Sequence, residues 1–271
     1  MKMDLGHLLV TLTLLFTGLQ AAEWGYWGRI GPENWPGICQ TGKQQSPIDI
    51  STKDVIKTDD FDPLIFGRYN ESFSATLEND GHSVEIKLHD DDDPTYLSGA
   101  NLQSKYILDH MHFHWNAEHT VNGFHDPLEL HLVHYHNQYA NLSIAAKQKN
   151  GLAVVSVLYQ KDKYANPYLE PIVKTMREVL DRSGKSTEVQ EKLRPLSFLP
   201  EDHVSYYYYQ GSLTTPACDE SVIWFVLANK NTVSSAQVNV FKRLRGDHGR
   251  QTFNNRPTQK LYDRKVYHYL G

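Results

Sequence analysis

Tyr106-Ile-Leu-Asp-His-Met-His-Phe-His-Trp115 is a β-rich stretch in which three histidines stand at alternate positions. Because a β-strand points every second side chain to the same face, His110, His112 and His114 are predicted to project together. Glu129-Leu-His-Leu-Val-His134 follows it and has the apolar character of a buried strand, apart from its histidines. The two stretches predict neighbouring strands of a sheet that carries a histidine cluster.

These histidines are predicted to bind a metal ion. Histidine is seldom buried without a partner, so an imidazole on an apolar strand needs a metal or a hydrogen bond. Two histidines at alternate positions and a third on a later strand match a three-ligand zinc site, which keeps a fourth position open for water, as catalytic sites do. Spacing alone does not settle which histidines belong to the site. The alternatives to His112, His114 and His131 are His110 on the first strand and His134 or His136 on the second.

The composition is that of an ordinary globular protein, with 271 residues of which 40% are hydrophobic and 22% charged. The formal net charge of −5 gives no basic surface that would favour nucleic acid or an anionic membrane. No linker, repeat or low-complexity stretch divides the chain beyond its N-terminal region. Strand patterns at 83–88, 106–115, 128–136, 153–159 and 222–227, with helical patterns at 167–183 and 234–244, predict a β-dominated α+β single domain with peripheral helices.

The N-terminal residues 1–22 have the pattern of a secretory signal peptide. Lys2 supplies a positive charge, residues 8–16 an apolar core, and residues 18–22 a small-residue exit. Cleavage is expected near residues 21 and 22, which leaves 23–271 as the catalytic domain. The apolar stretch is short for a bilayer span, and the C-terminal residues carry no apolar tail for an anchor. We therefore expect a soluble, secreted, extracellular protein.

The cysteines and two sequence triplets are consistent with secretion. Cys39 and Cys218 are the only cysteines, so in an oxidising compartment they are expected to form a disulfide. The triplets Asn70-Glu-Ser72 and Asn141-Leu-Ser143 are acceptor sequences for N-glycosylation.

Short motifs along the chain resemble those of known families. His112-x-His114-x3-Glu118 is similar to a cupin metal motif, but the second cupin motif, a late histidine after Pro-x-Gly, is not apparent. A larger set of motifs resembles the α-class carbonic anhydrases, from Trp24-Gly-Tyr26 to Asn254-Asn-Arg-Pro257. Between these ends lie Gln44-Gln-Ser-Pro-Ile-Asp49, Gly81-His82, His112-Phe-His-Trp115, Glu118-His-Thr120, Glu129-Leu-His-Leu-Val-His134 and Gly211-Ser-Leu-Thr-Thr-Pro216. All of them in order make the resemblance highly specific.

This resemblance implies a fold and a reaction. The family has a single domain around a central, mostly antiparallel ten-stranded twisted sheet, with zinc in a conical cleft. The ligands implied are His112, His114 and His131, and the activity implied is the reversible hydration of carbon dioxide to bicarbonate and a proton. In that reaction zinc-bound hydroxide is the nucleophile, and water displaces the bicarbonate.

The resemblance also implies roles for residues around the zinc. Thr214 would accept a hydrogen bond from the zinc-bound hydroxide and donate one to Glu118. His82 would act as the proton shuttle, since an imidazole titrates near neutrality, and Tyr26 would help to order the water molecules that carry the proton. The residues implied to surround the substrate are Thr214, Thr215, Val133, Val154, Leu213, Val222 and Trp224.

Three residues are implied to support the ligands from behind, namely His110, Glu129 and Asn254. His110 departs from the family, which usually has glutamine there; an imidazole accepts from His112 only as the right tautomer. Glu85 also departs, because it adds negative charge at a position that is often asparagine or glutamine.

Cys39 and Cys218 fall where secreted members carry their disulfide. The main rival is a non-catalytic, carbonic-anhydrase-like binding module, but such relatives typically lack one or more of the zinc histidines. The oligomeric state is not predicted.

Overall fold

The computed structural model describes residues 23–90 and 92–271. The signal peptide predicted for residues 1–22 lies outside them. Within the described residues, the largest sheet has thirteen strands. Ten of these follow one another in the order β12-β4-β5-β7-β10-β11-β14-β13-β18-β2, while β3, β6 and β15 pair beside this path. The prediction of a β-dominated domain around a large central sheet is confirmed.

The strands of the large sheet vary from three residues to eleven. Their bounds are β2 Ile56–Thr58, β3 Leu64–Gly67, β4 Ala75–Asn79, β5 Val84–Leu88, β6 Tyr96–Gly99, β7 Tyr106–Trp115, β10 Leu128–His136, β11 Leu152–Asp162, β12 Lys185–Glu188, β13 Tyr206–Gly211, β14 Val222–Leu227, β15 Asn231–Ser234 and β18 Tyr267–Tyr269.

The remaining elements are short. The small strands are β1 Asp49–Ile50, β8 Thr120–Val121, β9 Phe124–His125, β16 Arg245–Gly246 and β17 Gly249–Arg250. The α-helices are α1 Ile38–Thr41, α2 Leu142–Ala145, α3 Glu170–Val179 and α4 Ser235–Phe241, and the 3₁₀ turns are η1 Gly28–Ile30, η2 Pro32–Asn34, η3 Pro167–Leu169 and η4 Pro195–Phe198.

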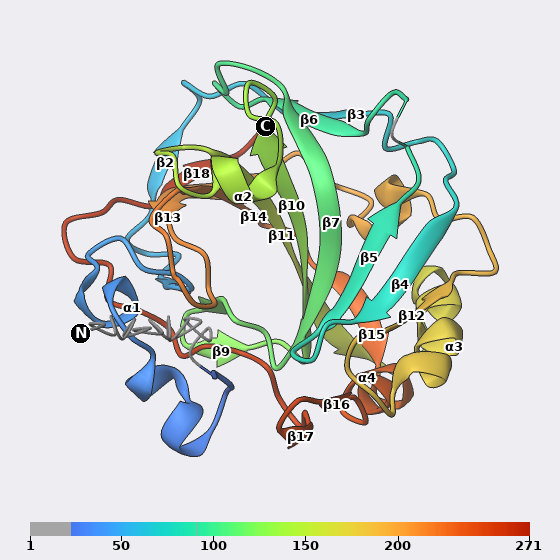
Figure 1. Ribbon diagram of the computed structural model, residues 1–271. Helices are drawn as coiled ribbons and strands as arrows, with labels where there is room; N and C mark the ends of the chain where they lie inside the picture. The colour runs from blue at the N-terminus through green and yellow to red at the C-terminus, as the bar shows by residue number, and fades with distance from the viewer. Residues whose placement is uncertain (1–22, 91) are drawn as a thin grey trace, which may run out of the picture.

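Strand pairing in the large sheet is mostly antiparallel, as the family resemblance implied. The parallel pairs are β11 with β14, β11 with β15, and β18 with β2. The long strands β7, β10 and β11 run through the middle of the molecule (Figure 1). Strand β10 pairs antiparallel with both β7 and β11, so side chains of the three strands lie side by side on each face of the sheet.

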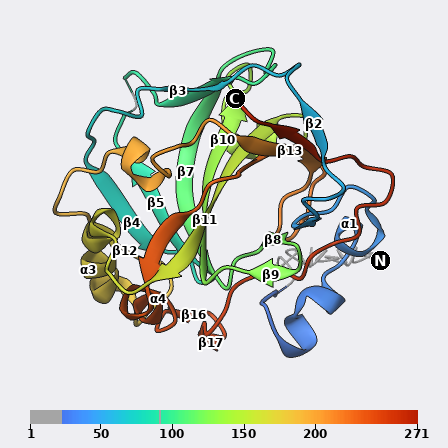
Figure 2. The same ribbon diagram turned by 180° about the vertical axis from the view of Figure 1, so that it is seen from behind.

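The two faces of the sheet carry different apolar clusters. The larger cluster holds Leu108 and Met111 from β7 together with the apolar side of α3 and α4. A second cluster holds Val133 from β10 and Val154 from β11. Figure 1 and Figure 2 show α3 and α4 together at one end of the molecule, with α1 at the other.

Predicted and observed elements agree best for the long strands, where β7, β10 and β14 have the predicted bounds. The predicted helix at 167–183 is shorter in the structure, because a 3₁₀ turn precedes α3 and the helix ends at Val179. The chain then turns at Gly184, whose φ of +72° favours glycine, and enters β12. An apolar stripe marks the face that packs but does not mark where a helix stops.

Candidate metal centre and its surroundings

Three histidines converge at the centre of β7 and β10. His131 pairs directly with His112 across the two strands, and His114 lies two residues further along β7. One ligand nitrogen from each lies within 4.8 Å of the others, and His114 and His131 are buried while His112 is partly exposed. His112 Nε2 and His114 Nε2 are 3.1 Å apart. Alternation on a strand and direct pairing across strands therefore produce the predicted cluster.

The hydrogen bonds behind two of these rings decide which nitrogen carries the lone pair. His114 Nδ1–H donates to the backbone carbonyl of Asn254 at 2.7 Å, and His131 Nε2–H donates to Glu129 Oε1 at 2.7 Å. Because a carbonyl and a carboxylate only accept, the lone pairs are on His114 Nε2 and His131 Nδ1. Burial lowers the pKa of His112, His114 and His131, which favours neutral rings. Three neutral, converging imidazoles are a donor set that fits zinc.

Glu129 is the centre of a buried network behind the ligands. Its Oε1 accepts from His131 Nε2, from His119 Nδ1 and from the Ser156 hydroxyl, each at 2.7 Å. Burial opposes the ionisation of this carboxyl group, but the neighbouring rings of His119 and His131, which donate to it, hold its pKa well below the usual range. His119 also contacts the Tyr209 hydroxyl at 2.7 Å. An ionised Glu129 thus orients His131 and raises its strength as a ligand.

Asn254 links the ligand strand to the segment that carries His82. Its backbone carbonyl accepts from His114, and its Oδ1 accepts from the backbone N–H of Trp115 at 2.8 Å. Its Nδ2 donates to the carbonyls of His82 and Phe113. All three residues expected behind the ligands, His110, Glu129 and Asn254, therefore contact a ligand in the structure.

Glu118 is fully buried beside the histidines. Its Oε1 accepts from the backbone N–H of Arg256 at 2.8 Å, and its Oε2 lies 3.5 Å from His114 Nε2. Burial raises the pKa of Glu118 to about 7, against lowering by His131, Arg256 and Thr214. Within the described chain, Oε2 is buried without a hydrogen bond of normal geometry. Thr214 is also buried, and its side chain is one of the groups that lower the pKa of this carboxyl group.

His82 stands on the turn before β5. The turn needs Gly81, whose φ is +92° and where a Cβ would collide with neighbouring side chains. Asp80 Oδ1 accepts from the backbone N–H of His82 at 2.7 Å. The His82 ring stacks on Trp24, with centroids 3.7 Å apart and planes at 13°. Burial lowers the pKa of His82, while the charges of Asp80 and Asp247 raise it.

The apolar residues expected around the substrate lie together. Val133, Val154, Val222 and Trp224 are buried members of one cluster, and the partly buried Leu213 packs against it. The Trp224 ring is 4.9 Å from the His131 ring, measured between centroids. This cluster lies on the histidine side of the sheet, opposite to the larger core. Thr215 follows Thr214 in the loop between β13 and β14 and is partly exposed.

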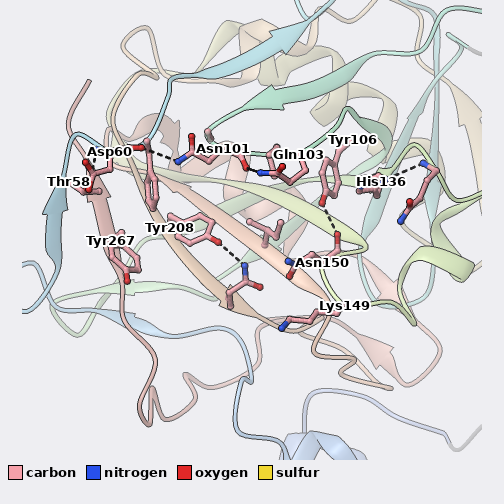
Figure 3. A pocket seen from close by; sticks show the side chains of 16 residues that line it. Thr58, Asp60, Asn101, Gln103, Tyr106, His136, Lys149, Asn150, Tyr208 and Tyr267 are labelled. Atoms are coloured by element: carbon pink, nitrogen blue, oxygen red, sulfur yellow. Dashed lines mark hydrogen bonds between the residues drawn. The ribbon is translucent and has the colours of Figure 1, made fainter.

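The other candidate ligands are separated from the cluster. His134 is buried, contacts the Tyr69 hydroxyl and hydrogen-bonds to the Ala153 carbonyl. His136 lines a cavity of about 690 Å³ with Tyr106 and Tyr208, both part of or packed against the larger core. Figure 3 shows His136 near Tyr106 in this cavity. Alternation places both histidines on the opposite face from His131.

His110 stays on the face of the ligands but behind one of them. Its Nε2 is 3.1 Å from His112 Nδ1, so its ring backs His112 and does not join the convergent nitrogens. Two neighbours of this site were not predicted from the sequence. His119 stood in a quoted motif without a role, and Asp109, whose Oδ2 is 2.7 Å from His110 Nδ1, was not singled out.

The predicted disulfide and its surroundings are present in the structure. Cys39 and Cys218 are bonded and lie in a small buried cluster with Tyr26 and Trp35. Burial, followed by the charges of Glu118 and Asp80, raises the pKa of Tyr26 well above its usual value. The described part of the chain has no helix long and apolar enough to cross a membrane.

Comparisons with known proteins agree with this geometry. Residues 30–270 match the family model described as eukaryotic-type carbonic anhydrase. The chain is also 36% identical over 277 residues to carbonic anhydrase 6 of Mus musculus, an alignment that covers 96% of this chain and 85% of that protein. The converging histidine triad, the fixed lone pairs of His114 and His131, and the match over nearly the whole described chain lead to one conclusion. The chain belongs to the eukaryotic-type carbonic anhydrases and is a zinc enzyme that hydrates carbon dioxide reversibly to bicarbonate and a proton.

Proposed function

We propose that His112, His114 and His131 are the zinc ligands of this reaction, and that Glu118, Thr214 and His82 act on its protons. The observation that carries the proposal is the convergence of three buried or partly buried imidazoles whose outer nitrogens are hydrogen-bonded. When bound by three neutral imidazoles, zinc keeps one position for water and lowers the pKa of that water, an effect for which carbonic anhydrase is itself the reference case.

Glu118 and Thr214 would orient the reacting oxygen. The buried Glu118 Oε2 needs a donor, and the hydroxyl of Thr214 would supply it. With its own proton committed to Glu118, Thr214 Oγ1 presents only lone pairs and accepts a hydrogen bond from the reacting oxygen. Carbon dioxide would meet that oxygen against the apolar cluster of Val133, Val154, Leu213, Val222 and Trp224, beside Thr215.

His82 would carry the proton away from the site. Its ring is held against Trp24, its Nδ1 has no hydrogen-bond partner within the described residues, and Asn254 ties its backbone to the ligand strand. An imidazole with a pKa at or below neutrality accepts and releases a proton readily. Tyr26 would help to order the intervening water from its buried position.

The protein would act outside the cell, as a mature chain of residues 23–271. The signal pattern at residues 1–22, the disulfide and the family match inside the proposed mature chain support this. Asn70 and Asn141 are exposed, as glycosylation requires. Asn141 caps α2 through Oδ1, which leaves its Nδ2 for a glycan.

Two variants separate the proposed roles in stopped-flow carbon dioxide hydration. His82→Ala should lower kcat by about tenfold or more in dilute buffer, leave kcat/KM near the wild-type value, and recover with added imidazole. Thr214→Val should instead lower kcat/KM by about tenfold or more, without rescue by imidazole. His89→Ala, at an exposed histidine on the adjoining strand end, serves as the control. Unchanged kcat in His82→Ala, or imidazole rescue of Thr214→Val, would contradict the assignments.

A further inference from the structure

Asp109 and His110 form a hydrogen-bonded chain that ends on the ligand His112. Asp109 Oδ2 is 2.7 Å from His110 Nδ1, and His110 Nε2 is 3.1 Å from His112 Nδ1. The two imidazole rings lie 5.1 Å apart between centroids with their planes at 27°. The side chains of Asp109 and His110 are 24% and 12% exposed, so solvent competes only partly for these contacts.

A β-bulge in β7 allows the side chains of Asp109 and His110, which are adjacent in sequence, to contact each other. Val133 pairs with His110 and His134 with Leu108, so Asp109 has no partner on β10. In a regular strand adjacent side chains point to opposite faces, whereas a bulge turns one of them. The same bulge places Leu108 in the larger core while His110 backs a ligand.

We infer that Asp109 is a positioning residue which, through His110, holds the zinc ligand His112 in its binding tautomer. The Asp109 carboxylate only accepts, so His110 carries its proton on Nδ1 and a lone pair on Nε2. That lone pair accepts from His112 Nδ1–H and leaves His112 Nε2 free to face the metal. The inference rests on the proposed assignment of His112 as a ligand.

Glu85 is the competing acceptor. Its Oε2 lies 3.8 Å from His110 Nε2, and its Oε1 is paired with Lys87 Nζ at 2.8 Å. If His110 carried its proton on Nε2 and donated it to Glu85, that nitrogen could no longer accept from His112. Asp109 holds the closer contact and so selects the productive tautomer.

The test measures the rate at which the zinc-loaded protein releases metal to excess dipicolinate at one fixed pH. Asp109→Ala should accelerate release by about ten- to a hundredfold, because losing a group that supports a ligand weakens metal affinity by about that factor. His110→Gln should stay within about threefold of wild type, because the amide oxygen accepts from His112 without needing Asp109. Adding Asp109→Ala to His110→Gln should then change the rate no further. Asp59→Ala, which removes one exposed charge, is the control.

The double variant separates positioning from a merely structural effect. Equal acceleration by Asp109→Ala in both backgrounds would overturn the inference, because Asp109 would not be acting through His110. A wild-type release rate in Asp109→Ala would overturn it too. A wild-type protein that binds no zinc would overturn the proposed ligand set itself, whereas the first two outcomes leave that set intact.

Discussion

At each histidine of this site, one hydrogen-bond acceptor fixes the tautomer of the ring and therefore which nitrogen can bind a metal. Glu129 and the Asn254 carbonyl leave His131 Nδ1 and His114 Nε2 free, and Asp109 does the same for His112 at one remove. Each of these groups is polar and lies in or beside a strand of apolar residues. The structure tolerates them because they hydrogen-bond to one another, as buried polar groups must.

His134 is a buried histidine of a different kind, and it predicts acid sensitivity. Burial lowers its pKa from 6.5 to about 4. As the pH falls below about 6.5, the unfolded chain binds this proton first, so the free energy of unfolding decreases down to about pH 4. The loss from this residue is about 3 kcal/mol.

Urea unfolding of wild type and His134→Gln from pH 7 to pH 4 checks this. The other buried histidines titrate in both proteins, so the difference between their pH slopes reports His134. His89→Gln, at an exposed position, should keep the wild-type slope. Parallel pH profiles for wild type and His134→Gln would show that the residue contributes nothing.

Individual elements show what a sequence pattern can and cannot specify. The bounds of β7, β10 and β14 were predicted because alternation and apolar runs are local signals. The bulge at Asp109 was not, since it exists only in the register between β7 and β10. Spacing alone also left His110, His134 and His136 open as ligands. The family resemblance, which also rests on motifs outside these strands, indicated that these three histidines are not ligands.

Helix α4 was predicted at 234–244 and spans Ser235–Phe241, so it ends earlier than predicted. Its start is within one residue of the prediction, because the N-terminal cap is encoded locally. Ser234 Oγ accepts from the Gln237 backbone N–H, and Gln237 Oε1 accepts from the Ser234 N–H, which is a capping box. Ser234→Ala should therefore lower the free energy of unfolding by about 1 kcal/mol.

Denaturant unfolding at constant pH measures this loss. Ser235→Ala is the matched control, because Ser235 is exposed in the first turn and should change stability by less than about 0.5 kcal/mol. Equal losses in the two variants would mean that the cap contributes no more than an ordinary surface serine.

Contacts between parts of the chain that are distant in sequence hold the N-terminal part of the domain against the rest. The disulfide joins Cys39 to Cys218 across a sequence separation of 179. Cys218 lies in the loop that carries Thr214, and the buried Arg256 donates to the Cys39 carbonyl at 2.7 Å and backs Glu118 through its own N–H. The segment around Cys39 and the loop that carries Thr214 are thus packed together. The two cysteines predicted a disulfide, but the sequence did not show that it would lie beside Arg256 and Glu118.

Loss of the disulfide should destabilise the molecule as a whole. The double variant Cys39→Ser with Cys218→Ser should lose about 2–4 kcal/mol of unfolding free energy, because the unfolded chain is no longer cross-linked. Mass analysis of the native protein without reductant should show no thiol labelling. Two labelled thiols, or an unchanged unfolding midpoint in the double variant, would contradict this.

The central claim is that hydration depends on zinc held by His112, His114 and His131. The most direct measurement is stopped-flow carbon dioxide hydration with metal analysis on the same sample, for wild type and His112→Ala. We predict one zinc per chain with rapid hydration in wild type, and loss of both in the variant, with far-ultraviolet circular dichroism confirming that it folds. Full hydration activity in a metal-free His112→Ala protein would contradict the account.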